Sequence, residues 1–209
     1  MTRRIVRYAL DMSGIDTALS IALGIGLAAA VGFRVFLPLA IASVAAYTGH
    51  LNLSEGFAWL GTPAAMIMLG VAAVVEVLAY YVPAVDNVLD SITTPLALTA
   101  GTIVSAAVIT DLPPLIKWST AIIAGGGVAA ITQGATSMLR AKSTAFTGGL
   151  GNPVLSTFEM FAAGTVTVLA LVVPVLAVAL VALFCWVAVR LARRFIRRRE
   201  NAAPPQAPP

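Results

Sequence analysis

Three ionisable side chains interrupt long apolar stretches of this sequence. Arg34 lies within GFRVFLPLA (residues 32–40), and Glu76 and Glu159 each lie within a run of apolar residues. If those runs cross a bilayer, each charge costs at least about 2.5–3.5 kcal/mol at the membrane centre, so it is expected to face a cavity or a partner. A buried carboxylate there can take up a proton or a cation, and a buried guanidinium can bind a carboxylate or a phosphate.

The two glutamates admit three interpretations. In the first, Glu76 and Glu159 form a proton or cation site near the membrane midplane. In the second, each is protonated or paired with Arg34 or Arg140, and these pairs lock the helices together. In the third, both lie at the membrane interface. The first interpretation makes them functional residues, and the second makes them structural ones.

Arg34 admits two interpretations. If the first helix runs outward from Thr17, Arg34 ends it and extends to the outer headgroups. Alternatively, Gly32 and Pro38 break the helix near Arg34, because proline removes a backbone donor and clashes with the carbonyl four residues earlier. The freed N–H groups and the guanidinium would then bind an anionic group. A polar stretch around Gln133 (TQGATS) is expected to be the corresponding interruption in the second half of the chain.

Three further residues are secondary candidates. Asp86 and Asp90 are four residues apart on one face of a short helix, where they bind a cation or lie solvated at a turn. Arg140 is a candidate partner for the glutamates. The chain has one histidine, His50, and one cysteine, too few for a metal site of several converging ligands or for a convincing hydrolytic triad. We therefore expect no metal, no cofactor and no enzymatic activity.

The composition is that of an integral membrane protein. Of 209 residues, 59% are hydrophobic and only 11% are charged, too few to cover the surface of a soluble domain. Uncharged runs such as 56–75 and 160–189 are long enough for helical spans, which need about 20 apolar residues. The net charge of +4 comes from arginines at the two chain ends, a pattern typical of membrane topology rather than of nucleic-acid binding.

The helices that must position these residues can be outlined from the sequence. Residues 15–47 would span roughly 50 Å as one helix against a hydrocarbon core of about 30 Å, so they must break or fold back near Gly32 and Pro38. Residues 153–191 are long enough for two passes with a turn near Pro174. The expected parts are a basic lead (1–14), a first transmembrane repeat (15–110), a second repeat (111–197) and a disordered proline-rich tail (198–209). Within them we expect a loop at 49–61, spans at 62–82, 91–110 and 116–139, the last interrupted at 132–134, a turn or half-helix at 83–90 and a loop at 140–152.

Three pairs of similar segments, in the same order, indicate an internal duplication. The clearest pair is ASVAAYTGHL (42–51) with AKSTAFTGGL (141–150), and the others are GLAAAV with GVAAIT and VEVLA with FEMFA. The last pair sets Glu76 opposite Glu159. Three passes separate the copies, so the second would be inverted, as in many transporters. We therefore expect an all-α polytopic membrane protein with about six transmembrane helices, arranged as two inverted three-helix repeats with broken or re-entrant helices.

The basic residues also predict a topology. Lysine and arginine beside spans mark the cytoplasmic side, so both termini are expected to be cytoplasmic. Residues 49–61 contain neither and are expected outside, whereas residues 140–151 carry Arg140 and Lys142 and are expected inside.

The motifs GFRVFLPL, VPAVDNVLDSI and TGGLGNPVLSTFE, in this order, resemble those of a family of small bacterial membrane proteins catalogued as domain of unknown function 4126. The resemblance covers roughly residues 18–195 and implies a polytopic protein of the bacterial inner membrane, with no established activity. The family pattern often has an acidic–basic pair just before the proline of the second motif, where this chain has Tyr80 and Tyr81. Separately, RVFLP (34–38) is similar to the Arg-Phe-x-Pro signature of DedA-type lipid-carrier flippases.

These features together favour a membrane transporter. The expected substrate is a small anion or the anionic head of a lipid carrier, with or without proton coupling, and the expected site is formed by Arg34, Glu76, Gln133 and Glu159. The alternative is a non-catalytic accessory or scaffold subunit of a larger membrane complex. Membrane lipids are the expected partners, and a second copy of the chain or another membrane subunit is an open alternative. A water-accessible cavity reaching the glutamates would favour transport, and a dry, ion-paired centre would favour a scaffold.

Overall fold

The structure, a computed structural model, describes residues 2–201, and this range is helical with no β-strand. Helix α1 includes residues 2–14 of the predicted basic lead, and α8 includes residues 198–201, which the sequence assigned to a disordered tail. Residues 202–209 of that tail, and residue 1, lie outside the described residues. The helices are α1 (Thr2–Phe33), α2 (Phe36–Tyr47), the 3₁₀ segment η1 (Glu55–Gly61), α3 (Pro63–Ala79), α4 (Pro83–Val108), α5 (Pro114–Thr120), the π-helical segment η2 (Ala121–Gly126), α6 (Gly127–Thr147), α7 (Asn152–Val172) and α8 (Pro174–Asn201).

Within the described residues, five helical segments are long and apolar enough to cross a membrane. The consecutive helices η1 and α3 form a sixth if they count as one span, although they are bent by 66° at their junction. The chain is therefore a helical, multi-pass membrane protein, as its composition predicts. The five segments are Gly14–Phe33, Val88–Val108, Pro114–Thr147, Asn152–Val172 and Pro174–Leu191.

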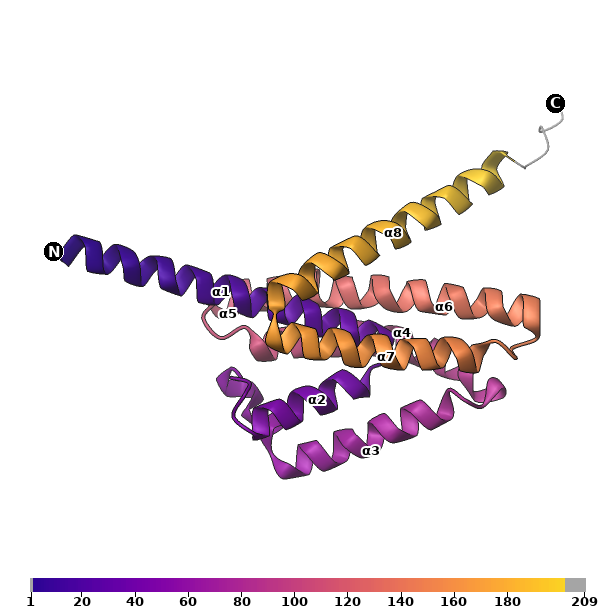
Figure 1. Cartoon of the computed structure of the whole chain (residues 1–209), viewed down its shortest axis with the longest axis horizontal. Coiled ribbons are helices and arrows are strands. Elements are labelled where there is room, and N and C mark those ends of the chain that lie inside the picture. Colours follow the sequence, from indigo (N-terminus) through magenta and orange to yellow (C-terminus); the bar gives the residue numbers. More distant parts are fainter. Residues whose placement is uncertain (1, 202–209) are drawn as a thin grey trace.

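Helices α1 and α2 fold back on each other at Arg34. The middle of α1 contacts the C-terminal part of α4, where the Ser105 hydroxyl donates a 2.8 Å hydrogen bond to the Gly24 carbonyl. The loop after α2 reaches the same part of α4, where the Ser54 N–H donates to the Ala107 carbonyl at 2.8 Å. The end of α2 therefore lies at the end of the bundle from which α1 enters, and Figure 1 shows α2 running back in this direction.

The connecting segments gather at two opposite ends of the bundle (Figure 1). Residues 48–62 and 109–113 lie at the first end, which we call the η1 end. At this end the Lys117 ammonium donates to the Ser54 hydroxyl at 3.2 Å. At the second, which we call the α6–α7 end, lie residues 80–82 and 148–151. The segments 49–61 and 148–151 are thus at opposite ends, which agrees with the opposite placement expected from the sequence.

The turn at Arg34 changes one part of the expected topology. A first pass straight across the membrane would separate residues 49–61 from the N-terminus. Because α2 returns, these residues lie instead at the end from which α1 enters. In Figure 1 the start of α1 and the C-terminal end of α8 lie on opposite sides of the bundle. Which end faces the cytoplasm stays a prediction.

Helix α6 is continuous where the sequence led us to expect an interruption. It runs through residues 132–134 and on to Thr147, so the interruption is absent and the expected loop at 140–152 is shortened to 148–151. A single glycine in a helix costs only about 1 kcal/mol, and packing of the neighbouring Gln133 side chain inside the bundle outweighs it. The departure from α-helical geometry comes earlier, at η2.

Helix α4 also differs from its prediction, whereas the turn between the last two helices agrees. Residues 83–90 are the first turns of α4 rather than a separate half-helix, and α4 continues through Pro95. Membrane helices tolerate such prolines because neighbouring groups satisfy the freed carbonyls. The predicted turn near Pro174 is confirmed, since α7 ends at Val172 and α8 begins at Pro174.

Small residues bring α1, α4 and α6 close together at the centre of the bundle. A Cβ added to Gly32 would lie 2.5 Å from the Thr132 Cβ, and one added to Gly101 would lie 2.5 Å from the Ala129 Cβ. Such close backbone approach is a common way for membrane helices to associate without a hydrophobic driving force. It holds the last turn of α1 firmly against α6 and so fixes the position of the break that follows.

Candidate functional site: a buried charge cluster at the helix break

Arg34 lies in the break between α1 and α2, inside the protein. Its N–H makes the last helical hydrogen bond of α1, to the Ala30 carbonyl at 3.1 Å, and α2 begins two residues later at Phe36. The residue is 1% exposed. Of the two interpretations of Arg34, this geometry agrees with a buried guanidinium at a break and not with an arginine extended to the headgroups.

Glu76 holds the start of α2. Its carboxylate accepts hydrogen bonds from the Val35 N–H at 2.7 Å and from the Phe36 N–H at 3.0 Å. The first N–H groups of a helix have no partner within the helix, and the helix dipole favours negative charge at this terminus. Pro38, the third residue of α2, has no N–H that would need a partner. A carboxylate from α3 therefore makes the sharp break tolerable at membrane depth.

The Arg34 guanidinium points toward α7. Its Nη2 donates to the Ser156 carbonyl at 3.0 Å and contacts the Ser156 hydroxyl, and it lies 3.6 Å from a carboxylate oxygen of Glu159. Its Nε and Nη1 atoms are buried and have no hydrogen-bond partner within the described structure. Arg34 is thus only partly satisfied by the protein around it.

Arg140 on α6 completes an ionic network with Glu159 and Asp90. Its Nε donates to Glu159 Oε1 at 3.1 Å, its Nη2 contacts Glu159 Oε2, and its Nη1 donates to Asp90 Oδ1 at 2.7 Å. Glu159 therefore lies between two arginines and links α6, α7 and the α1–α2 break. This network agrees with the interpretation in which the glutamate pairs with arginines and locks helices together.

Tyr80 contacts both arginines, and its role was not expected from the sequence. The Arg34 and Arg140 guanidinium carbons are 3.9 and 4.0 Å from the centre of its ring. Its hydroxyl is 3.1 Å from the Thr93 hydroxyl and donates to Asp90 at 3.4 Å. The available signal was that tyrosines replace the acidic–basic pair of the family pattern, since an aromatic ring can also contact cations.

The remaining candidates lie at the margin of this cluster or outside it. Gln133 donates to the Thr93 hydroxyl at 2.9 Å and to the Ser137 hydroxyl at 3.3 Å, so it joins the cluster through Thr93. Asp86 lies in the first turn of α4, but its side chain is outside the described residues. Among the residues searched, no group of three or more His, Cys, Asp or Glu side chains could hold a metal ion.

A comparison with family models now assigns the chain. The model described as "Domain of unknown function (DUF4126)" matches residues 21–194, a range that contains every residue of the cluster. The chain belongs to this family. Neither the curated proteins nor the solved structures contain a match to it. The family description states no activity, so the function of this DUF4126 chain rests on the geometry of the cluster.

The cluster lies at membrane depth, closer to the α6–α7 end. Asp90 and Glu159 are each the eighth residue of their helices counted from that end, and Arg140 is seven residues before the end of α6. At 1.5 Å per residue these positions are roughly 10 Å below the helix ends. Glu76, three residues before the end of α3, is shallower. The DUF4126 chain thus places Asp90, Arg140 and Glu159 about two helical turns below one end of the bundle.

The charges of the cluster do not cancel. It contains two guanidinium groups and three carboxylates, which leaves a formal charge of −1 when all are ionised. A net charge in a medium of low polarity is costly, because Coulomb energies there are several times larger than in water. A group of this composition can lower its energy by taking up one proton or one small cation, or by exchanging partners around the two arginines.

Proposed function

We propose that this protein is a membrane transporter that binds a small anion at Arg34 and takes up protons on the neighbouring carboxylates. The observation that carries the proposal is the state of Arg34. Two of its nitrogens, Nε and Nη1, are buried without a hydrogen-bond partner in the described structure, at a helix break. Buried donors are rarely left unsatisfied, and a guanidinium offers a planar fork that suits carboxylate or phosphate oxygens.

The charge balance supports proton coupling. An anion entering a cluster that already carries a formal charge of −1 would raise the electrostatic energy further. Protonation of Glu159 would weaken its hold on Arg34 and Arg140 and remove one negative charge. Anion and proton are therefore expected to bind together, and the carboxylate that releases the arginines is the expected proton acceptor.

The burial of the cluster favours a small substrate over the head of a lipid carrier. The side chains of Arg34, Arg140 and Glu159 are at most 8% exposed, and Asp90, at 17%, is the most accessible member of the ion pairs. A large headgroup would have to displace whole helices to reach Arg34. The proposed entry route begins at Asp90, on the side of the α6–α7 end.

The inverted-repeat hypothesis is part of this proposal. Helix α3 brings Glu76 to the cluster near its C-terminal end, whereas α7 brings Glu159 there near its N-terminal end, so the two helices run in opposite directions. The similar segments also end alike, because Gly49 after α2 and Gly148 after α6 both have positive φ angles, 77° and 62°. The unbroken α6 is the clearest difference between the proposed copies.

A scaffold or accessory role in a membrane complex is the second candidate, and one observation favours it. The centre around Arg140 is ion-paired to Glu159 and Asp90 across three helices, which is the arrangement expected of a structural lock. The two candidates differ in Arg34. A lock has no need of unpartnered donors, whereas an anion site requires them.

Proton movement in proteoliposomes tests the proposal. Liposomes containing the purified protein and a trapped pH-sensitive dye are exposed separately to external phosphate, acetate and chloride. We expect at least one anion to acidify the lumen through the wild-type protein, and Arg34→Lys to reduce the rate at least tenfold, because lysine lacks the fork. Arg190→Lys, at an exposed arginine beside Trp186, is the matched control. Anion-independent behaviour of the wild type, together with a stably co-purifying membrane partner, would support the scaffold role instead.

A further inference from the structure

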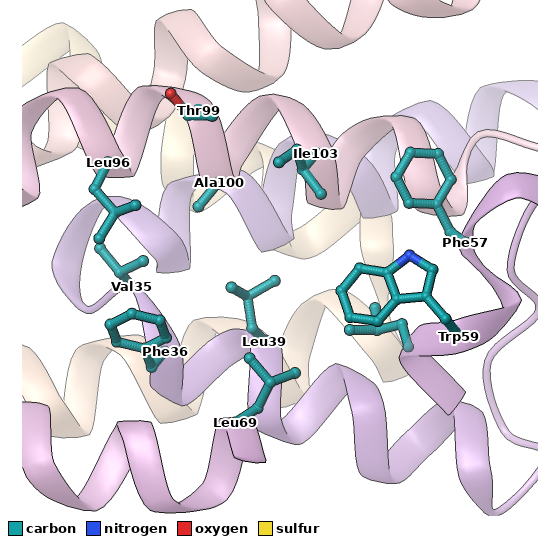
Figure 2. A pocket seen from close by; sticks show the side chains of 11 residues that line it. Val35, Phe36, Leu39, Phe57, Trp59, Leu69, Leu96, Thr99, Ala100 and Ile103 are labelled. Carbon is teal, nitrogen blue, oxygen red and sulfur yellow. The ribbon is translucent and has the colours of Figure 1, made fainter. Parts of the chain in front are cut away.

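A second feature, separate from the charge cluster, is an apolar pocket between α2, η1, α3 and α4. Its volume is about 190 Å³, and Figure 2 shows side chains of all four segments directed into it. Val35 lines it just before α2, Phe36 and Leu39 on α2, Phe57 and Trp59 on η1, and Ala100 on α4. It extends from the helix break toward the η1 end. The pocket is larger than the apolar cavities of about 150 Å³ that stay dry and bind benzene.

The wall of the pocket offers nothing to a polar ligand. The surface that lines the pocket is apolar. Of the two lining side chains that carry a polar atom, Thr99 donates its hydroxyl to the Pro95 carbonyl at 3.0 Å, and Trp59 has a single indole N–H. The backbone N–H groups of Val35 and Phe36 are held by Glu76. An anionic headgroup inside the pocket would lose its hydration without gaining a partner. The occupant must therefore be a hydrocarbon, and its polar end, if it has one, must remain outside.

The position of the pocket identifies the source of that hydrocarbon. The α4 residues that line it, from Leu96 to Ile103, lie in the middle of the span Val88–Val108. Several lining residues are also partly exposed on the outer surface, including Ile103 at 36% and Trp59 at 49%. In a membrane-spanning bundle, such a surface faces lipid chains. An acyl chain is thus available where the pocket opens.

The η1 end of the pocket carries the groups that recognise a phospholipid headgroup. The Lys117 ammonium lies 5.8 Å from the centre of the Phe57 ring, which lines the pocket, and one of its three N–H groups is used on Ser54. The Phe57 and Trp118 rings are 6.2 Å apart. Lys117 is the fourth residue of a span, and tryptophan and lysine are typical residues of the membrane interface.

We propose that this pocket binds one acyl chain of a membrane phospholipid whose phosphate contacts Lys117 at the η1 end. The acyl chain would enter beside Phe57 and Trp59, and its methyl end would reach Val35 and Phe36. Val35 precedes α2 and Phe36 begins it, and Glu76 holds the N–H groups of both, so a bound lipid would support the same helix break. The site is independent of the proposed anion transport, because Arg34 contributes no atom to it.

Native mass spectrometry of the delipidated, detergent-purified protein tests the site. The probes are phosphatidylglycerol and diacylglycerol with the same chains, so that headgroup and chain contributions separate. We expect one tightly bound phosphatidylglycerol on the wild type. Ala100→Phe, which places a ring in the pocket, should weaken both probes at least tenfold. Ile92→Phe, at an exposed position of the same helix, should leave both unchanged.

Lysine substitutions test the headgroup contact without altering the pocket. Lys117→Gln should weaken phosphatidylglycerol about fivefold and leave diacylglycerol unchanged, whereas Lys142→Gln, at the other end of the bundle, should have no effect. Arg34→Lys should also have no effect, which distinguishes this site from the anion site. Equal binding of phosphatidylglycerol by the wild type and by correctly folded Ala100→Phe would overturn the proposal. If Ala100→Phe does not fold, equal binding by the wild type and Lys117→Gln would do so.

Discussion

Arg34 and Arg140 share one aromatic ring, that of Tyr80. Their guanidinium carbons lie 3.9 and 4.0 Å from its centre, so both cations contact the ring. The negative face of an aromatic ring attracts cations, so the ring offsets part of the cost of burying the two like charges. Glu159 contacts the same two arginines from α7. The ring and the carboxylate together allow two cations to be buried close to each other.

Replacing Tyr80 separates the contribution of its ring from that of its hydroxyl. Tyr80→Leu should lower the free energy of unfolding by about 2 kcal/mol or more, because a desolvated cation–π contact contributes about that much. Tyr80→Phe keeps the ring and loses only the hydroxyl contacts to Thr93 and Asp90, so its effect should be about 1 kcal/mol. Thermal unfolding in one detergent measures both. A larger loss of stability in Tyr80→Phe than in Tyr80→Leu would mean that the hydroxyl contacts contribute more than the ring contacts.

The two glutamates should respond differently to neutralisation. Glu159→Gln leaves two buried arginines with less compensation and should cost roughly 3–5 kcal/mol, the usual effect of breaking a buried ion pair. Glu76→Gln keeps one acceptor for the start of α2 and should cost less, about 1.5–3 kcal/mol. Stability is measured by thermal unfolding, and hydrogen exchange of residues 35–39 reports the cap. Equal losses in both variants, with unchanged exchange at α2, would argue against the capping role of Glu76.

The ion pair of Arg140 with Glu159 can be isolated by a double-mutant cycle. Arg140→Leu and Glu159→Leu should each destabilise strongly, because each leaves a buried charge without its main partner. The double substitution should lose clearly less than the sum of the two, by roughly 1–3 kcal/mol, since contacting residues couple in this range. Thermal unfolding of the four proteins completes the cycle. Additive losses would mean that the two side chains contribute independently.

The sequence identified most members of the cluster because charges are costly inside apolar runs. Arg34, Glu76 and Glu159 were expected on that ground, and the structure brings them together. Arg140 was expected only as a candidate partner in a loop, and it lies instead inside α6 and 1% exposed. Tyr80 could not be predicted in the same way, because a tyrosine near a helix end is equally common at an interface or in a core. Nor could the sequence establish that Glu76 caps α2 rather than pairing with an arginine, because that depends on the distance between two helices.

The helical class of the fold could be predicted from the sequence, but the path of the chain could be predicted only in part. Chain length and hydropathy indicated a break near Gly32 and Pro38, and the break is found at Arg34. The direction of the chain after the break was not predictable, because it depends on which surfaces of α2 pack against α3 and α7. The interruption expected at Gln133 was wrong for a related reason. A polar residue in an apolar run indicates a buried partner as readily as a break, and here Thr93 is that partner.

The close contact between α1 and α6, just before the helix break, can be tested by substitution. Gly32→Ala should destabilise the protein by about 1–3 kcal/mol, because the added Cβ would lie 2.5 Å from the Thr132 Cβ and 2.6 Å from the Ala129 carbonyl oxygen. Gly70→Ala is the control, since no atom lies within 4 Å of its added Cβ and alanine favours the helix. Thermal unfolding should separate the two variants. Equal stability would mean that α1 and α6 are farther apart than described.

The return of α2 is tested by labelling single cysteines in a Cys185→Ser background. Asp16→Cys marks the start of the α1 span, Glu55→Cys marks the η1 end, and Leu150→Cys marks the α6–α7 end. Because α1 turns back at Arg34, residues 16 and 55 should react with an impermeant maleimide from the same side of the membrane, and residue 150 from the other. A straight first pass would instead place residue 55 with residue 150.

Intact vesicles of both orientations, with a permeant maleimide as the control for reactivity, distinguish the two topologies. Labelling of residues 16 and 55 from opposite sides would rule out the hairpin at Arg34, and with it the buried break on which the proposed anion site depends.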